Sequence, residues 1–171
     1  MKFVISSTAL FSHLQAIGRV INSKNTLPIL DCFLLELNDG VLSLTASDNE
    51  TTMATSLEVN ESDGNCRFAI NAKTILDALK EIPEQPLTFD FNPNTLEILV
   101  QYMNGRYSVV AQNADEYPIP VTLGETAVHV EMEASTLLNG INRALFATAD
   151  DELRPVMNGI YFDIFTEYVT L

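Results

Sequence analysis

The chain has 171 residues, of which 23 are acidic and 9 are basic, so its net charge is −14 at pH 7. Such a charge argues against a nucleic-acid-binding protein, whose contact surface is usually basic. The sequence contains no apolar run of about 18 residues, which excludes a membrane-spanning helix. The apolar run at residues 3–5 is too short for the core of a signal peptide, so we expect a cytoplasmic protein without membrane contact.

The segment from Met1 to Gln112 reads as a series of strands interrupted by two helices. Leu10 and Leu14 recur at helical spacing in the first helix, and Ile75 and Leu79 do so in the second. Between two strands, Gly40 is placed for a turn that needs positive φ. The predicted strands are residues 2–5, 30–37, 41–47, 51–59, 67–70, 87–91, 96–101 and 106–112, and the predicted helices are residues 8–21 and 72–82.

A linker is predicted at residues 113–124, which contain Pro118 and Pro120. After it, the spacing predicts a strand, a helix and two further strands. We therefore predict a first domain at residues 1–122 and the start of a second at residues 123–171. The predicted elements after the linker are the strand 128–132, the helix 134–148 and the strands 156–164 and 168–171.

The order of elements after the linker repeats the order at the N-terminus, at a constant offset and without a gap. The evidence is matched polarity and spacing rather than identity. A complete copy takes about 120 residues and the second has only about 45, so we expect a truncated second domain with an open apolar face. The matched sets are Phe3 and Ile5 with Val130 and Met132; Leu10, Phe11 and Leu14 with Leu137, Leu138 and Ile141; Pro28, Ile29 and Leu30 with Pro155, Val156 and Met157; and Leu42 and Leu44 with Val169 and Leu171.

Positive charge is gathered on the predicted helices. On helical wheels, their basic residues fall on the faces opposite the apolar stripes. A phosphate backbone is attracted to such a face and repelled by the acidic remainder, which suits contact with DNA that is independent of sequence. The alternative is that these charges only keep amphipathic helices soluble. The residues are Arg19, Lys73, Lys80 and Arg143, with Lys24 just after the first helix.

Residues that could carry chemistry are few. His13 and His129 have no partner at a recognisable catalytic or metal-ligand spacing, and Cys32 and Cys66 are too isolated for a redox or zinc motif. No phosphate-binding loop, dinucleotide-binding fingerprint or nucleophile elbow is present. We therefore expect no cofactor, no metal and no catalytic residue.

Two alternative functions remain open at the level of the residues. The cluster Asp150, Asp151 and Glu152 has the oxygen ligands that a hard cation prefers, so a metal-dependent α+β enzyme is one alternative. Such a cluster is more often a solvated loop. The other alternative is a protein-interaction scaffold.

Several strings, in this order, resemble the beta subunit of bacterial DNA polymerase III, the sliding clamp. The resemblance covers essentially the whole chain but only the first one-and-a-third of the three domains of that family. The strings are Thr26-Leu27-Pro28-Ile29-Leu30, Leu42-Ser43-Leu44-Thr45-Ala46-Ser47-Asp48, Gly105-Arg106-Tyr107-Ser108-Val109, Ala114-Asp115-Glu116-Tyr117-Pro118 and Arg154-Pro155-Val156-Met157-Asn158-Gly159-Ile160.

The resemblance implies an α+β DNA clamp fold, in which two helices of each domain line a ring and two small antiparallel sheets lie outside. It implies a processivity factor for DNA replication, which encircles duplex DNA and tethers the polymerase. The implied partners are duplex DNA, the polymerase III alpha subunit, the clamp loader and a second chain that completes a homodimer ring. Such a subunit is not an enzyme, although it belongs to a DNA-directed DNA polymerase.

The resemblance also implies roles for individual residues. Lys24 matches a basic position in a DNA-facing loop, and Arg154 matches a basic residue near the path of the DNA. An aromatic pair that often follows this position in the family is replaced by Pro155 and Val156, so stacking on DNA is not expected there. Met157 matches one wall of the pocket that binds polymerase peptides.

The family's subunit contact is the remaining site that the resemblance implies. In the ring, one edge of the first domain meets the third domain of the partner chain. The residues that match this edge are Lys73, Ala78, Tyr107 and Val109.

Overall fold

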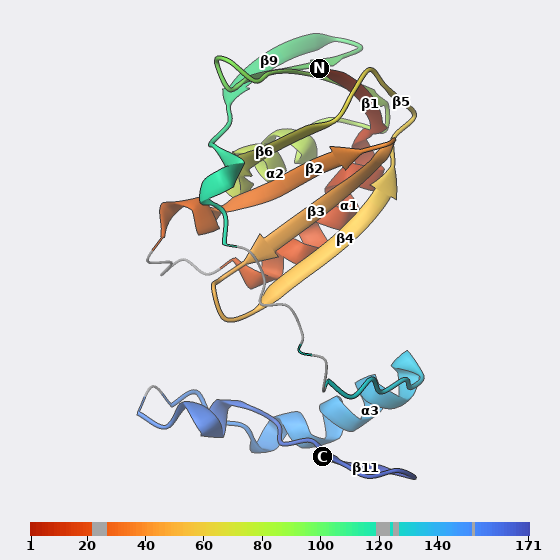
Figure 1. Ribbon diagram of the computed structural model, residues 1–171, viewed down its shortest axis with the longest axis vertical. Helices are drawn as coiled ribbons and strands as arrows, with labels where there is room; N and C mark the ends of the chain where they lie inside the picture. Colours follow the sequence, from red (N-terminus) through yellow and green to blue (C-terminus); the bar gives the residue numbers. More distant parts are fainter. Residues whose placement is uncertain (22–26, 119–123, 125–126, 152) are drawn as a thin grey trace. The chain divides into compact units, whose positions relative to one another are not determined.

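The computed structural model describes residues 1–21, 27–118, 124, 127–151 and 153–171. They fall into two compact units, Met1–Val121 and Thr122–Leu171, which we call unit 1 and unit 2. Each combines helices with antiparallel strands, so the predicted α+β class is confirmed (Figure 1). No helix formed by the described residues is long and apolar enough to cross a membrane.

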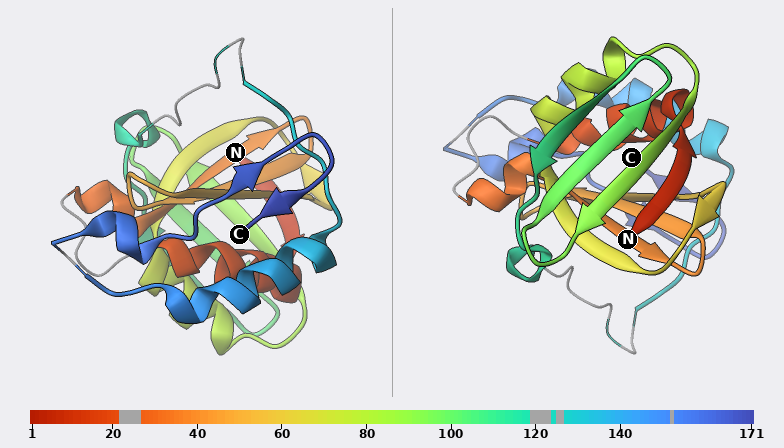
Figure 2. Two further views of the ribbon diagram at one scale, coloured as in Figure 1. Left: turned by 90° about the horizontal axis from the view of Figure 1, so that it is seen from below. Right: turned by 90° about the horizontal axis from the view of Figure 1, so that it is seen from above.

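Unit 1 contains a five-stranded sheet, seen face-on at the right of Figure 2, and a four-stranded sheet, in both of which all neighbours are antiparallel. Alternate side chains of each strand enter the core, as the period of two predicts. In spatial order, the first sheet holds β5 (Glu61–Ser62), β1 (Lys2–Ser6), β7 (Pro86–Asn92), β8 (Glu97–Tyr102) and β9 (Gly105–Val110), and the second holds β4 (Thr52–Glu58), β3 (Val41–Ser47), β2 (Cys32–Asn38) and β6 (Cys66–Asn71).

Two α-helices of unit 1 have side-chain N-caps and bury the predicted apolar stripes. The helix α1 (Ser7–Ile17) continues into the 3-10 turn η1 (Gly18–Val20), and α2 is Ala72–Lys80. The Ser6 hydroxyl accepts a hydrogen bond from a backbone N–H of α1, and the Asn71 side chain does so for α2. In the core, helix side chains such as Leu14 pack with the stacked rings of Phe3 and Phe89, whose centroids are 4.9 Å apart.

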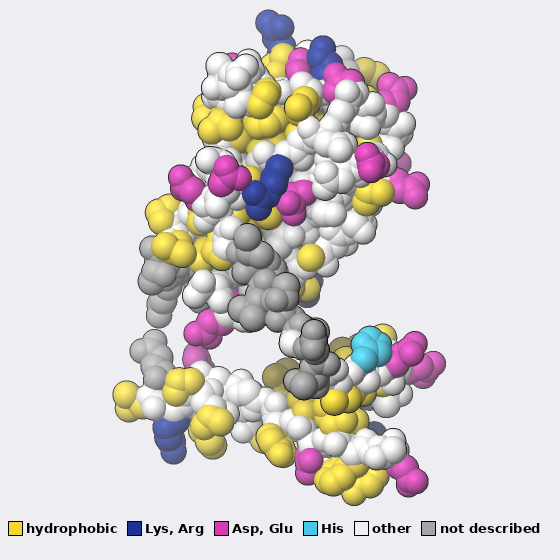
Figure 3. Space-filling model, in the orientation of Figure 1, with side chains coloured by type: hydrophobic (Ala, Val, Ile, Leu, Met, Phe, Trp, Pro, Cys, Tyr) yellow, Lys and Arg dark blue, Asp and Glu magenta, His cyan; other side chains and the backbone are white. Residues whose placement is uncertain are grey.

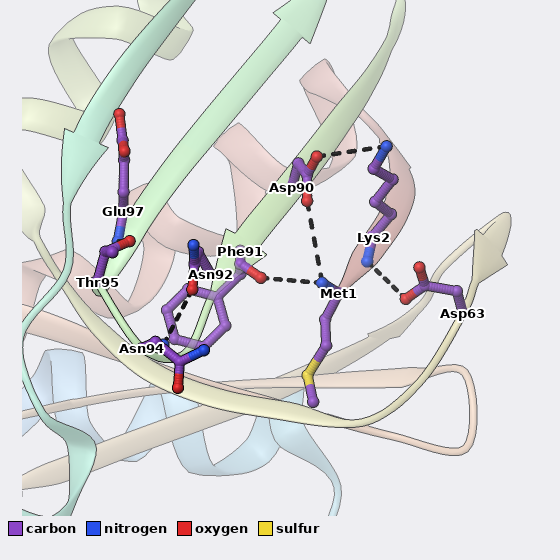
Figure 4. Close-up of polar contacts among 9 residues, drawn as sticks. All are labelled: Met1, Lys2, Asp63, Asp90, Phe91, Asn92, Asn94, Thr95 and Glu97. Atoms are coloured by element: carbon purple, nitrogen blue, oxygen red, sulfur yellow. Dashed lines mark hydrogen bonds and ion pairs between the residues drawn. The ribbon is translucent and has the colours of Figure 1, made fainter.

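The strand β1 is held between β5 and β7 by polar contacts as well as by its buried side chains (Figure 4). The backbone N–H of Lys2 donates to Asp63 Oδ1 at 2.6 Å, and its Nζ lies 3.3 Å from Asp90 Oδ2. The ammonium group of Met1 donates to the carbonyl oxygen of Phe91 at 2.9 Å. The first strand is therefore an integral part of the sheet.

A second, smaller apolar cluster lies on the four-stranded sheet. It joins the 3-10 turn η2 (Pro28–Asp31) to the segment around η3 (Ala114–Glu116). The predicted linker at residues 113–124 is therefore wrong in its first part, because Ala114 and Tyr117 are buried in this cluster. The local composition of that segment is typical of a loop, and only the apolar surface of the sheet beneath it explains its packing.

Unit 2 contains the helix α3 (Ala134–Ala144), the 3-10 turns η4 (Leu145–Ala147) and η5 (Pro155–Asn158), and the hairpin of β10 (Asp163–Ile164) and β11 (Val169–Thr170). The strand predicted at residues 128–132 is absent, and the one predicted at 156–164 is reduced to its last two residues. A strand requires a neighbour for its backbone hydrogen bonds, and residues 128–132 have none among the described residues of unit 2.

The internal repeat is confirmed by the structure. The bounds of α3, η4 and η5 follow those of α1, η1 and η2 at the same constant offset, which takes Ser7 to Ala134 and Asp31 to Asn158. The two hairpins also share their register, since Asp163 pairs with Thr170 as Glu36 pairs with Ser43. The burial differs: no side chain of α3 is buried, whereas α1 buries its apolar stripe.

Candidate functional site

Basic side chains of unit 1 stand exposed on two neighbouring helical segments. The helices α1 and α2 lie side by side (Figure 1), with Arg19 in the turn that continues α1 and Lys73 and Lys80 on α2. None of these three side chains forms an ion pair within the described parts of the chain. Their charges are therefore free to act on a ligand in solution.

Two basic side chains on the strands form ion pairs instead. Lys2 on β1 lies against Asp90, and Arg67 on β6 lies 2.7 Å from Glu36 and 3.2 Å from Asp115. Figure 3 views unit 1 from the side of the four-stranded sheet, where acidic side chains are scattered and basic ones form no continuous patch. Arg19, Lys73 and Lys80 thus differ from Lys2 and Arg67, whose charges nearby acids neutralise.

The other predicted DNA contacts lie in unit 2 or outside the described residues. Arg143 is exposed on α3 and has no ion pair with a described residue. Arg154 instead pairs with Asp151, with Nη2 and Oδ2 2.8 Å apart. This guanidinium, together with backbone N–H donors, lowers the pKa of the Asp151 carboxyl. Lys24 lies outside the described residues.

The predicted subunit edge lies beside the end strand of the five-stranded sheet, β9. The structure brings Ala78 of α2 and Tyr107 of β9 to one cavity of about 420 Å³. Lys73 and Val109 do not line it, although both belong to the same two elements. Arg106 is a further exposed cation, and it forms no ion pair with the residues described. Helical periodicity does not reveal it, because it lies on the strand β9.

The Tyr107 hydroxyl oxygen is sealed from solvent and has no hydrogen-bond partner among the described residues. Burial, with a smaller effect of the nearby Tyr102, raises the pKa of Tyr107 to about 12. A buried polar group without a partner costs stability. This hydroxyl therefore lowers the stability of unit 1 at the predicted subunit edge.

Met157, the residue predicted for a partner-peptide pocket, lies in η5 and is 46% exposed. Its counterpart in unit 1 is Leu30 in η2, which is 1% exposed beneath Ala114 and Tyr117. The repeat thus places Met157 at an apolar position that unit 1 covers and unit 2 leaves open.

His13 and the two cysteines, which were considered as candidate catalytic residues or metal ligands, lie within the packed structure of unit 1. His13 Nδ1 lies 2.8 Å from the hydroxyl oxygen of Thr55, which joins α1 to β4. Cys32 and Cys66 are free thiols buried in unit 1. Within the described residues, no cluster of histidine, cysteine and acidic side chains is arranged to hold a metal. Glu152, the third residue of the acidic cluster, lies outside the described residues.

The chain is similar in sequence to bacterial beta sliding clamps. It is 29% identical over 164 residues to the beta sliding clamp of Haemophilus influenzae and 27% identical over 164 residues to that of Pseudomonas putida. The alignments cover 95% and 96% of this chain and 44% of each relative, so the chain spans less than half of their length.

Solved structures share the fold. The DNA polymerase III subunit beta of Pseudomonas aeruginosa matches with a TM-score of 0.87 at 24% identity, over 97% of this chain and 44% of that one. The pol III beta of Caulobacter crescentus matches with a TM-score of 0.85 at 22% identity, over 98% and 45%. The DNA clamp fold predicted from the sequence is thereby confirmed.

The family model of the DNA polymerase III beta subunit, N-terminal domain, matches residues 1–122, which is more than half of the chain. The chain therefore belongs to the family of DNA polymerase III beta subunits.

Proposed function

We propose that the protein containing this chain is a sliding clamp, a non-catalytic processivity factor that encircles duplex DNA and tethers the replicative polymerase. Residues 1–122 are its first clamp domain and residues 123–171 begin its second. Family membership supports the proposal, and the arrangement of charge carries it. Unpaired cations line two adjacent helical segments of a chain whose net charge is −14.

This arrangement suits a protein that slides. Arg19, Lys73 and Lys80, with Lys24 and Arg143, attract phosphates, whereas the acidic remainder repels them. Arg154 contributes less, because Asp151 already neutralises it. Phosphate contacts carry no sequence information, so the DNA passes these side chains without a preferred register.

We further propose the subunit edge at β9 and α2, formed by Lys73, Ala78, Tyr107 and Val109. An end strand has unpaired backbone groups that a strand of a second chain can complete. The cavity of about 420 Å³ that Ala78 and Tyr107 share gives this edge a recess for a partner side chain. The partner is a second copy of the full-length protein, which forms a homodimer ring.

Met157 is proposed as one wall of the site that takes peptides of the polymerase III alpha subunit and the clamp loader. Its apolar side chain, at the position that Leu30 holds in an apolar cluster of unit 1, supports this assignment. An apolar surface of this kind favours a short segment with an apolar or aromatic side chain.

Retention on circular DNA tests the ring. The full-length protein, loaded by its clamp loader on a nicked duplex circle, is expected to remain bound through gel filtration and to leave when the circle is cut. The linear duplex of the same sequence is the control. Equal retention on the circular and linear forms contradicts encirclement.

A further inference from the structure

Gln85, in the loop between α2 and β7, is a polar residue that is only 8% exposed. Its Oε1 accepts a hydrogen bond from the backbone N–H of Met103 at 2.7 Å, and its Nε2 donates to the carbonyl oxygen of Pro83 at 3.3 Å. The side chain thus uses an acceptor and a donor at once. A carboxylate has no donor and an apolar side chain has neither group, so this pair of bonds calls for an amide.

The backbone around Gln85 is bonded to Ser7, the first residue of α1. The N–H of Ser7 donates to the carbonyl oxygen of Gln85 at 2.9 Å, and the N–H of Gln85 donates to the Ser7 hydroxyl at 3.0 Å. That hydroxyl donates in turn to the Pro83 carbonyl oxygen at 2.9 Å. Ser7 is 1% exposed, so these bonds lie in the interior, where a hydrogen bond is stronger than in water. Gln85 is therefore held in one position relative to the core.

The hydrogen bond from Met103 reaches Gln85 from the turn of the hairpin that β8 and β9 form. The ladder of this hairpin ends where Tyr102 pairs with Gly105, and Met103 follows Tyr102 in the turn. Met103 is 83% exposed, so its side chain adds little packing. The backbone bond to the Gln85 amide therefore ties this turn to the core of unit 1.

The same turn forms part of the cavity of about 420 Å³ at the predicted subunit edge. Gln85, Tyr102 and Asn104 line this cavity together with Ala78 and Tyr107. The ring centroids of Tyr102 and Tyr107 lie 6.5 Å apart. The strand β9 begins directly after the turn and is the end strand of its sheet, at the left in the right-hand view of Figure 2. A shift of the turn would therefore alter both the cavity and the edge.

We propose that Gln85 is a positioning residue of the subunit edge. Its two side-chain hydrogen bonds, which we call the amide lock, fix the turn of the β8–β9 hairpin and so present β9 and its cavity to the second chain in one arrangement. This inference rests on the proposed function, in which β9 and α2 form the edge. An edge that is already ordered in the free subunit loses less conformational entropy on binding, so the lock favours the dimer.

Amide hydrogen exchange of this chain, followed by NMR, tests the amide lock by itself. In Gln85→Ala the N–H of Met103 loses its acceptor, so its exchange rate is expected to rise about tenfold. Ser47→Ala is the matched control, because Ser47 is also buried and accepts a backbone N–H, from Asn49 at 3.1 Å, but in the turn between β3 and β4. The Met103 rate is expected to stay within about twofold of the wild-type rate in this control. An unchanged Met103 rate in Gln85→Ala, or an equal rise in Ser47→Ala, overturns the proposal.

The dissociation constant of the full-length dimer tests the consequence for the ring. Analytical ultracentrifugation is expected to show a dissociation constant about tenfold higher for Gln85→Ala than for the wild type, and a change below about twofold for Ser47→Ala. Equal effects of the two variants contradict a positioning role. A wild-type protein that forms no dimer overturns the proposed subunit edge instead, and the exchange rate of Met103 distinguishes that failure from a failure of the amide lock.

Gln85→Glu gives a readout that depends on the amide itself and covers the case in which Gln85→Ala does not fold. A protonated carboxyl has both a donor for the Pro83 oxygen and an acceptor for the Met103 N–H, whereas the ionised form has no donor. Burial raises the pKa of a carboxyl at this position, and two acidic neighbours raise it further: Glu81, which lines the same cavity, and Glu84.

The lock of Gln85→Glu is therefore expected to hold at pH 5 and to open at pH 8. The ratio of its Met103 exchange rate to that of the wild type, which cancels the intrinsic effect of pH on exchange, is expected to rise about threefold or more between these values. A ratio that is independent of pH overturns the proposal.

Discussion

Ile164 lies opposite Val169 in the hairpin of unit 2, at the register at which Leu37 lies opposite Leu42 in unit 1. A shift of one residue moves every side chain of a strand to the other face of its sheet. A shared register therefore means that the two hairpins present equivalent faces. Position by position, the described residues of the two units can therefore be compared in equivalent surroundings.

Equivalent helix positions are expected to differ in their contribution to stability. Leu14→Ala removes a side chain of α1 that is 0% exposed and should lower the free energy of unfolding of unit 1 by about 2–5 kcal/mol. Ile141→Ala, at the corresponding position of α3, lies in a helix without buried residues and should cost at most about 1 kcal/mol. Urea denaturation followed by circular dichroism measures both; equal losses contradict the difference in burial.

The unpaired helix cations are expected to set the salt dependence of DNA binding. In the full-length protein, replacing Arg19, Lys73 and Lys80 together by alanine should weaken binding to duplex DNA and reduce the salt slope by about 0.9 for each phosphate that the protein no longer neutralises. Fluorescence anisotropy at several salt concentrations measures it. Lys2→Ala is the control, since Asp90 neutralises Lys2 on β1. An unchanged slope in the triple variant argues against phosphate contact by these residues.

Two tyrosine hydroxyls of unit 1 are expected to have opposite effects when removed. Tyr107→Phe deletes a buried hydroxyl without a partner among the described residues, so stability should stay the same or rise by about 1–3 kcal/mol. Tyr117→Phe deletes the donor to the Cys32 carbonyl and should lower stability by about 1 kcal/mol. Urea denaturation of this chain compares the two. A clear loss in Tyr107→Phe shows that the hydroxyl has a partner in solution.

Alkaline pH is expected to destabilise unit 1. Burial raises the pKa of Cys32 and of Cys66 from 9.0 to about 11, and that of Tyr107 and of Tyr117 from 10.0 to about 12. Each group is neutral when protonated, and the unfolded chain loses these protons first. The stabilisation is therefore complete below about pH 9 and is lost as the pH rises, through about 11 for the cysteines and about 12 for the tyrosines.

The free energy of unfolding between pH 7 and pH 11 measures this loss. Cys32→Ala and Cys66→Ala each remove one of the titrating groups, so their stability should fall less steeply above pH 9 than that of the wild type. A wild-type stability that is constant to pH 11 contradicts the role of burial.

The sequence by itself determined the local features of this protein. Because helical and strand periods leave different patterns of apolar residues, the stripes Leu10–Leu14 and Ile75–Leu79 were predicted and are buried. Gly40 has the positive φ, 82°, that its turn requires. The constant offset between the two copies was also evident in the sequence, since a repeat preserves polarity and spacing even where identities are few.

Only the tertiary structure decided which of these patterns are satisfied. Residues 128–132 have the alternation of a strand but form none, because a strand depends on a neighbour that lies elsewhere in the chain. The ion pairs that separate Arg154 and Arg67 from the unpaired helix cations likewise depend on geometry that spacing does not reveal. Ala114 and Tyr117 show the same limit. They lie in a segment with the composition of a linker, but they are buried because apolar side chains of β2, far earlier in the chain, pack against them.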